Sequence, residues 1–512
     1  MKTFNTAGTC RPNEHYMVDI TERLAIIRRM VAKGDYFCIN RGRQYGKTTT
    51  LKAISTTLTD EYCIFSISFE GIDDCDFRDV ASTNATFLKL LRREAHWTHK
   101  EEPVASLLNE AADSGMDFAD IVAELCSVSS KPVVVLIDEV DQAGNNSGFV
   151  KFLDGLRGMY LNRDVAPTFQ SVILAGVYDI KNLKLKMRPE EQHQYNSPWN
   201  IAVPFDVDMS LSAAGIAGML ADYKADHSLE FDEQALAQMI RDYTAGYPFL
   251  VSRICQIIDN ERLTWDKEGV LKAVNSILVE RNTLFDSIVK KLDEYPELKR
   301  ILKDILFAGI EKSFNPDEKY IQMAAILNYI VNRDGKIAVA CRIMETRLYN
   351  LFISEDENTV SYKQGQIDKS AFVRDGAIDM PRLMERFIAH MNQTYSMDRE
   401  NEFIENDARK VFLTYLRPII NGVGSYHIEE QTRDHDRMDV VVDYLGQQYV
   451  IELKIWRGNS YNERGEQQLC RYLDYFGLKT GYLLSFCFNK SKRPGLLPPV
   501  TLQGRTLIEG IG

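Results

Sequence analysis

The segment Asn40-Arg41-Gly42-Arg43-Gln44-Tyr45-Gly46-Lys47-Thr48 decides the fold of the N-terminal half of this chain. It follows an apolar stretch, Tyr36 to Asn40, that is typical of a strand, and a helical pattern begins at Lys47. The backbone N–H groups of such a loop, with the N-terminus of the following helix, form a cradle for anions. The order strand, glycine-containing loop, helix therefore predicts a phosphate-binding loop.

The residue types in the loop match the chemistry of a nucleotide site. Gly46 lets the backbone approach the phosphates, Lys47 reaches the β and γ phosphates, and the Thr48 hydroxyl binds Mg²⁺. The usual pattern has its first glycine at position 41, but here Arg41 stands there and the glycine follows as Gly42. We predict that ATP is bound by Arg41, Gly42, Arg43, Gln44, Tyr45, Gly46, Lys47, Thr48 and Thr49.

A second apolar run, Val133 to Ile137, is typical of a parallel strand buried on both faces. It ends in Asp138-Glu139, and the carboxyl ends of parallel strands are where α/β proteins bind ligands. We predict that Asp138 supports the Mg²⁺ shell and that Glu139 orients the attacking water. The alternative is a strand that simply ends in solvated acidic residues.

The composition indicates a multidomain globular protein. The chain has 512 residues, 45% of them apolar, and a formal charge of −12 from 61 basic and 73 acidic residues. This balance argues against a generally basic surface for nucleic acid, although a local basic groove is compatible with it. Nine cysteines without a CxxC pair predict reduced thiols. No leader peptide or membrane span is apparent, so we expect a cytoplasmic protein that does not bind membranes.

Strands alternate with helices in the N-terminal part, which predicts an α/β fold with a parallel sheet covered on both faces. Helices then dominate, and Asp334-Gly335 between two β-rich runs predicts a hairpin. The expected domains are a P-loop core (1–210), a helical lid (211–290), a winged-helix-like module (291–356), a linker (357–397) and an α/β domain (398–512).

Several segments together resemble the bacterial AAA-ATPase-like family, over about half of the chain. They are Phe4-Asn5-Thr6 to Val18, Arg41 to Thr48, the strand ending at Asp138-Glu139, Ser197-Pro198-Trp199-Asn200-Ile201-Ala202-Val203 and Gly246-Tyr247-Pro248-Phe249-Leu250. The family also uses an Arg near the start of its loop. The resemblance implies an AAA-type sheet, with Tyr16, Met17 and Val18 near the adenine and the turn at Pro248 near the nucleotide.

The resemblance also leaves two questions open. Arg253 is either a sensor of the γ-phosphate or a member of a surface salt bridge. Val177 and Tyr178 stand where many AAA proteins have a polar sensor, so this chain departs from the family at that point.

A second group of polar residues lies near the C-terminus. Asp439 opens one strand, and after a turn at Gly446 the next strand carries Glu452-Leu453-Lys454. Period-2 alternation places Glu452 and Lys454 on one face, within reach of Asp439. Two carboxylates and the Leu453 carbonyl suit Mg²⁺, and Lys454 suits the charge that develops in phosphodiester hydrolysis. The alternative is an exposed strand face with an ion pair.

Gln468 and Tyr472 lie one helical turn apart and so face the same way. With Asp439, Glu452 and Lys454 they resemble the PD-(D/E)xK nuclease superfamily, in the branch with a Q-xxx-Y helix. The resemblance covers residues 398–512 and implies a metal-dependent nuclease. It also implies a carboxylate on the preceding helix, for which Glu405 and Glu402 compete.

Two functions follow from these patterns. The first is an ATP-regulated nuclease that cleaves DNA or RNA, with a role in defence suggested by the architecture alone. The second is a nucleotide-dependent switch for assembly or regulation whose C-terminal domain only binds a partner.

Two sets of basic residues each have two interpretations. Arg333, Lys336, Arg342 and Arg347 either contact nucleic-acid phosphates or form a solvated face, and Arg157 and Arg163 either complete a neighbouring subunit's site in a homo-oligomer or are surface charges.

Overall fold

The computed structural model describes residues 2–99, 103–111, 115–144, 146–177, 199–306, 312–354, 372–374, 376–394, 405–420, 424–428, 439–455, 459–486 and 494–512. The chain forms two compact units. The first comprises Met1–Ser228, Tyr247–Ser252 and Gln322–Asn328, and the second comprises Leu229–Gly246, Arg253–Ile321 and Tyr329–Gly512. Within the described ranges, no helix has both the length and the apolar character needed to cross a membrane.

The first unit contains the predicted parallel sheet. Its strands are β1 (Phe37–Asn40), β2 (Cys63–Ser68), β3 (Val133–Asp138) and β4 (Ser171–Gly176), in the order β1-β4-β3-β2. A parallel bridge between Val203 and Phe37 continues the sheet beyond β1. Because β4 lies between β1 and β3, its carboxyl end opens between the phosphate loop and Asp138.

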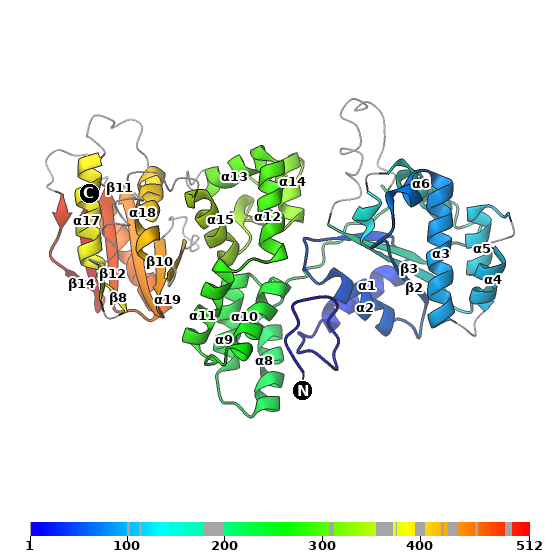
Figure 1. Cartoon of the computed structure of the whole chain (residues 1–512), viewed down its shortest axis with the longest axis horizontal. Coiled ribbons are helices and arrows are strands. Elements are labelled where there is room, and N and C mark those ends of the chain that lie inside the picture. Colours follow the sequence, from blue (N-terminus) through cyan, green and yellow to red (C-terminus); the bar gives the residue numbers. More distant parts are fainter. Residues whose placement is uncertain are drawn as a thin grey trace. The chain divides into compact units, whose positions relative to one another are not determined.

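Helices follow the strands of the first unit as the periodicity predicts. They are α1 (Thr21–Ala32), α2 (Lys47–Thr57), α3 (Val80–Thr98), α4 (Pro103–Ala111), α5 (Phe118–Val128) and α6 (Ser147–Leu161). Every residue of β3 is buried, as expected for a strand covered on both faces. Figure 1 shows α3, α4 and α5 side by side next to β2 and β3. Helix α3 begins at Val80 because Asp79 caps it, accepting a hydrogen bond from the Ser82 N–H at 2.8 Å.

The predicted helical region is divided between the two units. Helix α8 (Ala213–His227) belongs to the first unit, whereas α9 (Glu233–Thr244) and α11 (Lys267–Val279) belong to the second. Helix α10 (Pro248–Asn260) begins in the first unit and continues into the second. The region 211–290 is therefore helical as predicted, but it is not a separate compact body.

Helices and one hairpin make up the next stretch: α12 (Thr283–Glu294), α13 (Pro296–Leu306), α14 (Lys319–Ile326), β5 (Ile330–Arg333), β6 (Lys336–Val339) and α15 (Arg342–Ser354). The hairpin is where the sequence predicts it. Asp334 and Gly335 have φ values of 51° and 81°, the left-handed pair that a two-residue turn requires. Whether this stretch acts as a winged helix stays a prediction.

The C-terminal sheet is mixed, and its strand order is β13-β15-β12-β11-β10-β9, with β14 paired to β15. Strands β9, β10 and β11 are antiparallel, whereas β11, β12 and β15 are parallel. Helix α19 connects β11 to β12 and packs on one face of the sheet. The elements are β9 (Gly424–Ile428), β10 (Asp439–Tyr444), β11 (Gln447–Ile455), α19 (Asn459–Phe476), β12 (Thr480–Phe486), β13 (Gly495–Leu496), β14 (Val500–Leu502) and β15 (Arg505–Ile511).

The predicted linker, 357–397, is wrong over its C-terminal half. Two short strands, β7 (Val373–Arg374) and β8 (Ala377–Ile378), are followed by α17 (Met380–Thr394), which contacts β13 and β15. The Phe387 ring lies 5.1 Å from that of Phe412 on α18 (Glu405–Ile420). Figure 1 draws α17 and α18 against the strands of this sheet. The apolar stripe of α17 needs the sheet to cover it, so the folded domain begins well before residue 398.

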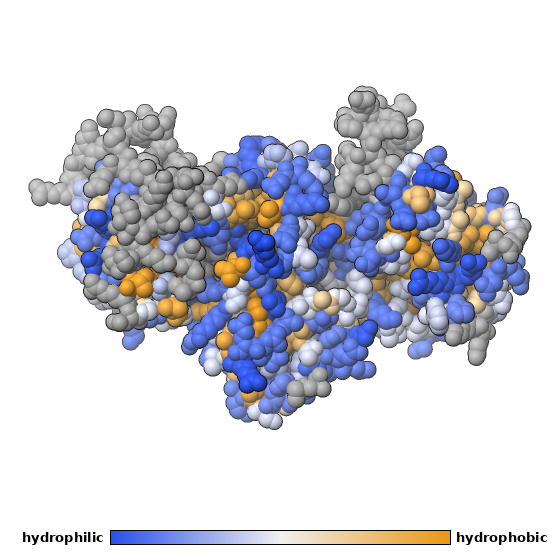
Figure 2. All heavy atoms as spheres, in the orientation of Figure 1, coloured by the Kyte–Doolittle hydropathy of each residue, from blue (hydrophilic) through white to orange (hydrophobic). Residues whose placement is uncertain are grey.

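Hydropathy on one face of the molecule and the state of the cysteines both fit a globular protein. On the face drawn in Figure 2, hydrophilic residues predominate over the described part, and hydrophobic residues form small separated areas. None of the eight described cysteines is in a disulfide, in line with the reduced thiols predicted from their spacing.

Candidate functional site

The phosphate loop joins β1 to α2 in the first unit. Gly46 caps α2 with a φ of 80°, a conformation that favours glycine, and the helix begins at Lys47. The buried ammonium of Lys47 donates to the carbonyl oxygens of Arg41 and Gly42, at 3.0 and 3.1 Å. Lys47 therefore lies across the mouth of its own loop.

The carboxyl end of β3 meets this loop. The Thr48 hydroxyl donates to Oδ2 of Asp138 at 2.6 Å, so the two predicted Mg²⁺ ligands are in direct contact. The Glu139 N–H donates to the other oxygen of the same carboxylate, at 2.9 Å. Glu139 itself has a φ of 52°, in the left-handed region. A sharp backbone turn thus follows Asp138 and aims the next acid away from the strand direction.

Charges of both signs meet at this edge of the sheet. Burial lowers the pKa of Lys47, and Asp141, Glu139 and Asp138 oppose that shift, in decreasing order. Burial raises the pKa of Glu139, and Asp141 and Asp138 raise it further. Asp141 is thus part of the same cluster, although the sequence patterns did not single it out. The sequence signal that could have identified Asp141 is the order Asp138-Glu139-Val140-Asp141, which puts a third acidic residue just after the strand.

The turn before Pro248 packs on the phosphate loop. Pro248 begins α10, and the hydroxyl of the preceding Tyr247 donates to the carbonyl oxygen of Arg43. The Tyr247 ring lies 4.7 Å from the ring of Tyr45, edge to face. The resemblance implied a contact of this turn with the nucleotide region, and the structure places Tyr247 against the loop itself.

Gly42, one residue later than the usual first glycine, has a steric reason to be glycine. A Cβ atom at this position would lie 2.8 Å from the carbonyl oxygen of Leu327 and 3.5 Å from the Tyr247 hydroxyl. The guanidinium of the neighbouring Arg41 donates to the carbonyl oxygens of Asn40 and Val207, at 2.8 and 3.0 Å. The structure therefore gives Arg41 supporting contacts with the backbone, and its part in binding ATP stays a prediction.

The N-terminal segment is held by contacts of its own. The Tyr16 hydroxyl donates to Asp226 at 2.9 Å, and its ring packs between Phe4 and Tyr223. The Thr49 hydroxyl accepts the Cys10 N–H at 3.2 Å, which ties this segment to α2. These contacts fix the segment beside the loop's helix, and the predicted proximity of Tyr16, Met17 and Val18 to an adenine stays a prediction.

Two arginines with a predicted role at a nucleotide site have structural partners instead. Arg253 forms an ion pair with Glu280 at 2.6 Å, so the salt-bridge alternative is the one observed. Arg163 lies 4.3 Å over the ring of Tyr160 and donates to the Gly34 carbonyl oxygen. Four predicted positions lie outside the described residues, namely Tyr178, Ser197, Pro198 and Glu402.

In the second unit, the register of the C-terminal sheet brings the predicted acidic positions together. Asp439 on β10 stands directly opposite Glu452 on β11. The Lys454 ammonium lies 3.0 Å from Glu452 Oε1, and their side chains are 8% and 0% exposed. An exposed ion pair, the alternative left open by the sequence, is therefore wrong.

Helix α19 covers the same face of the sheet. Val450 packs against α19 together with Tyr472, and period-2 alternation places Glu452 and Lys454 on the Val450 face. Gln468 lies one helical turn before the buried Tyr472. Glu452 and Lys454 thus lie on the face of β11 that α19 covers, with Leu453 between them in the chain.

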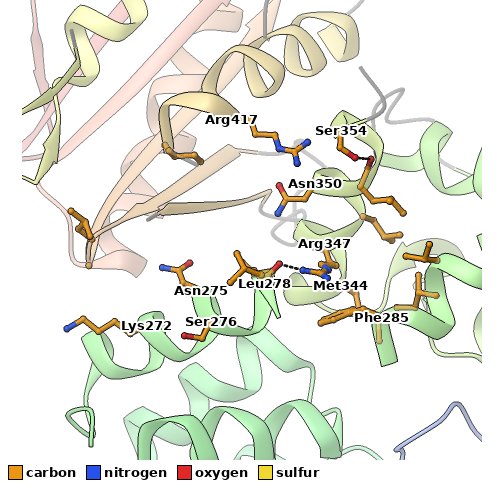
Figure 3. Close-up of a pocket in the computed structure, with 18 of the residues that line it drawn as sticks. Lys272, Asn275, Ser276, Leu278, Phe285, Met344, Arg347, Asn350, Ser354 and Arg417 are labelled. Atoms are coloured by element: carbon orange, nitrogen blue, oxygen red, sulfur yellow. Dashed lines mark hydrogen bonds between the residues drawn. The ribbon is translucent and has the colours of Figure 1, made fainter. Parts of the chain in front are cut away.

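A cavity of about 980 Å³ lies elsewhere in the second unit, between α11, α12, α15 and α18. Asn275, Asn350 and Arg417 are directed toward it in Figure 3. Arg347 also lines it, but its guanidinium donates to the carbonyl oxygens of Leu278 and Glu280 and lies 4.8 Å over the Phe285 ring. Arg347 thus holds the end of α11, which disfavours a role in phosphate contact.

No family model and no curated protein matches the chain. Among solved structures, it is similar to the Walker-type ATPase PABY2304 of Pyrococcus abyssi, at 14% identity and a TM-score of 0.45, over 67% of this chain and 99% of that chain. It is also similar to the ORC2 protein of Aeropyrum pernix in its ADPNP-ADP complexes, at 12% identity and 0.37, over 69% and 97%. A third is the ORC1 protein of Aeropyrum pernix in complex with DNA, at 12% identity and 0.27, over 66% and 94%. The P-loop arrangement described above rests on this chain's own strand order and contacts.

Proposed function

We propose that the first unit binds ATP with Mg²⁺ and hydrolyses it. The observation that carries this proposal is the contact between Thr48 and Asp138, 2.6 Å, at the mouth of a loop closed by the buried Lys47. A solvated pair of acids at a strand end would not place a threonine hydroxyl and a lysine from the facing helix in the same cluster. The AAA-type character of this unit belongs to the proposal as well.

The residues of the loop and of the end of β3 fit both Mg²⁺ and the phosphates of ATP. Thr48 and Asp138 offer neighbouring hard oxygen atoms, which Mg²⁺ prefers. The backbone of the loop from Gly42 to Gly46 and the N-terminus of α2 suit the phosphates. Bound Mg²⁺ would neutralise the charge of the phosphate oxygens. Lys47 must exchange its two carbonyl acceptors for phosphate oxygens, since both lie within the loop.

Other residues around the loop supply a base and hold the loop in place. Glu139, half-buried beside Asp138, is placed to orient a water molecule and to accept its proton. Tyr247, bonded to the Arg43 carbonyl oxygen, keeps the loop closed on its outer side. The buried sheet edge excludes bulk water, which strengthens the interactions of Lys47 with anions.

The test is binding of a methylanthraniloyl derivative of ATP and release of inorganic phosphate by the full chain. Lys47→Ala should weaken binding by about 10- to 100-fold, since a charged hydrogen bond contributes about 1.5–3 kcal/mol. Lys52→Ala, an exposed lysine on the same helix, is the matched control and should bind normally. Glu139→Gln should bind ATP and lose about 10²- to 10⁴-fold in turnover. Equal binding by Lys47→Ala and Lys52→Ala would contradict the proposal.

We further propose that the second unit cleaves phosphodiester bonds of nucleic acid in a metal-dependent reaction. The specific observation is the register of Asp439 opposite Glu452, combined with the buried Lys454 beside Glu452. Burying a charged pair costs several kcal/mol of desolvation, so such pairs are retained mainly where they have a task. A helix on the same face carries Gln468 and Tyr472.

This donor set fits Mg²⁺ or Mn²⁺. Carboxylates at positions 439 and 452 and the Leu453 carbonyl are oxygen donors of the type these ions take. A bound ion would polarise the phosphate and lower the pKa of a coordinated water. Lys454 is placed by its contact with Glu452 to stabilise negative charge that develops on the phosphate.

The test is cleavage of single- and double-stranded DNA and RNA with Mg²⁺ or Mn²⁺, with and without ATP. Lys454→Ala should abolish cleavage, and Lys479→Ala, an exposed lysine of the same domain, should not. An effect of ATP that disappears in Lys47→Ala would join the two activities in one nucleotide-gated enzyme. No cleavage of any substrate, with ATP still bound, would support the switch with a non-cleaving C-terminal domain instead. Assembly into a homo-oligomer is a part of either proposal that light scattering with and without ATP would test.

A further inference from the structure

Asp141 lies at the carboxyl edge of the first sheet and has no part in the function proposed so far. It belongs to the short helix η2 (Val140–Gln142), directly after Glu139. Its Oδ1 accepts a hydrogen bond from the N–H of Val177, at 2.7 Å. Val177 is the first residue after β4, so this carboxylate ties the loop after β3 to the end of the neighbouring strand.

The place of this contact follows from the strand order. Strand β4 lies between β1, which leads into the phosphate loop, and β3, which ends at Asp138. The end of β4 therefore opens directly between the two halves of the nucleotide site. Val177, the last described residue before position 178, is apolar and buried there. Asp141 brings a carboxylate to this position from the adjacent loop.

The packing around β4 is shaped to hold this carboxylate. A Cβ atom added to Gly176 would collide with Oδ1 of Asp141 and would lie 2.9 Å from a methyl carbon of Val140. Gly176 does not have a left-handed backbone, so conformational freedom does not account for the glycine. The Asp141 carboxylate occupies the space that a side chain at position 176 would need.

The Asp141 carboxylate also influences the pKa values of Lys47 and Glu139. Among the carboxylates that raise the pKa of Lys47 against burial, Asp141 has the largest effect. It is likewise the charged neighbour that most raises the pKa of Glu139.

We propose that Asp141 is a positioning residue for ATP hydrolysis, which anchors the loop that carries Glu139 to the end of β4. The inference rests on the proposed ATPase function of the first unit. Asp141 is three residues past the proposed Mg²⁺ ligand Asp138 and is assigned no contact with the metal or the reacting atoms. It acts through the position of the Glu139 loop.

Two substitutions at position 141 test the anchoring contact. Asp141→Asn keeps an oxygen that accepts the Val177 N–H, whereas Asp141→Ala removes the acceptor. We expect kcat to fall by about 10- to 100-fold in Asp141→Ala, the usual consequence of misplacing a reacting group, and to be largely retained in Asp141→Asn. ATP affinity should stay equal in both, because Asp141 is assigned no contact with the nucleotide. Asp154→Asn, an exposed aspartate on α6, is the matched control and should behave as wild type.

A third variant displaces the carboxylate without removing it. Gly176→Ala puts a methyl group into the space that the Asp141 carboxylate occupies and should lower kcat by a similar factor. In the Asp141→Ala background the same change should cause little further loss in kcat, because the two substitutions act on one contact. Fully additive losses in the double variant would overturn the assignment, since Gly176→Ala would then act through the core alone.

The remaining outcomes are also decisive. If wild type hydrolyses ATP, Glu139→Gln does not, and Asp141→Ala matches wild type in kcat, the proposed ATPase stands and the inference fails. If Asp141→Ala loses affinity and thermal stability in parallel with kcat, the role is structural and the inference again fails. If wild type binds ATP without hydrolysing it, the hydrolytic part of the proposed function fails, and a positioning role in hydrolysis fails with it.

Discussion

Replacement of Lys454 by methionine would leave a buried carboxylate in the C-terminal sheet without its positive partner. The Lys454 ammonium lies 3.0 Å from Glu452, and their side chains are 8% and 0% exposed. Methionine keeps the length and the unbranched shape of the lysine stem, so packing changes little. The main consequence is electrostatic, because water cannot reach Glu452 to replace the lost charge.

The burial of this pair sets the size of the effect. Removing one partner of a buried ion pair costs about 3–5 kcal/mol, against at most about 1 kcal/mol for an exposed pair. Opening of β11 should therefore become about 10²- to 4 × 10³-fold more frequent. The double variant Glu452→Gln, Lys454→Met removes both charges of this pair and should recover most of the loss.

Hydrogen exchange of peptides from β10 to β12, measured by mass spectrometry on the full chain, reports this local opening. Lys479→Met changes an exposed lysine in the same domain and should exchange as wild type. Two results would refute the reasoning. One is a change of under tenfold in Lys454→Met, the behaviour of a solvated pair. The other is a double variant as unstable as the single one, which would show that the two residues are not coupled.

Three further predictions concern glycine packing, helix capping and thiol reactivity. Gly42→Ala should destabilise the first unit by about 1–3 kcal/mol in thermal unfolding, because its Cβ would lie 2.8 Å from the Leu327 carbonyl oxygen. Gly155→Ala, where the added atom meets nothing within 4 Å, should instead stabilise α6 by up to about 1 kcal/mol, and the reverse ranking would contradict the packing. Asp232→Ala removes the side chain that caps α9 through the Gln234 and Ala235 N–H groups and should cost about 1 kcal/mol; unchanged hydrogen exchange in α9 would show that the cap contributes nothing. Burial raises the pKa of Cys126 to about 12, so at pH 8 iodoacetamide should modify the exposed Cys75 first; faster labelling of Cys126 in peptide mass spectra would be incompatible with its burial.

The sequence alone determined the features that depend on neighbouring residues. The strands that end at Asn40 and Asp138 and the hairpin turn at Asp334-Gly335 follow from apolar runs and left-handed turn chemistry, which act within a few residues. The two halves of the proposed nucleotide site could also be predicted to lie together, since Lys47 and Asp138 each follow or end a strand of the parallel sheet. Parallel strands bring their carboxyl ends to one edge whatever their order in the sheet.

The tertiary structure decided what depends on strand order and on packing between distant segments. The contact of Asp141 with Val177 exists because β4 lies between β1 and β3, and no local pattern encodes that order. Helix α17 was assigned to a linker because its apolar stripe has no meaning until a sheet covers it. Burial likewise separated a solvated ion pair from the enclosed Glu452 and Lys454, because the same two residues in the same spacing are compatible with either environment. Local chemistry therefore fixes elements and candidate residues, whereas the arrangement of elements fixes which residues share a site.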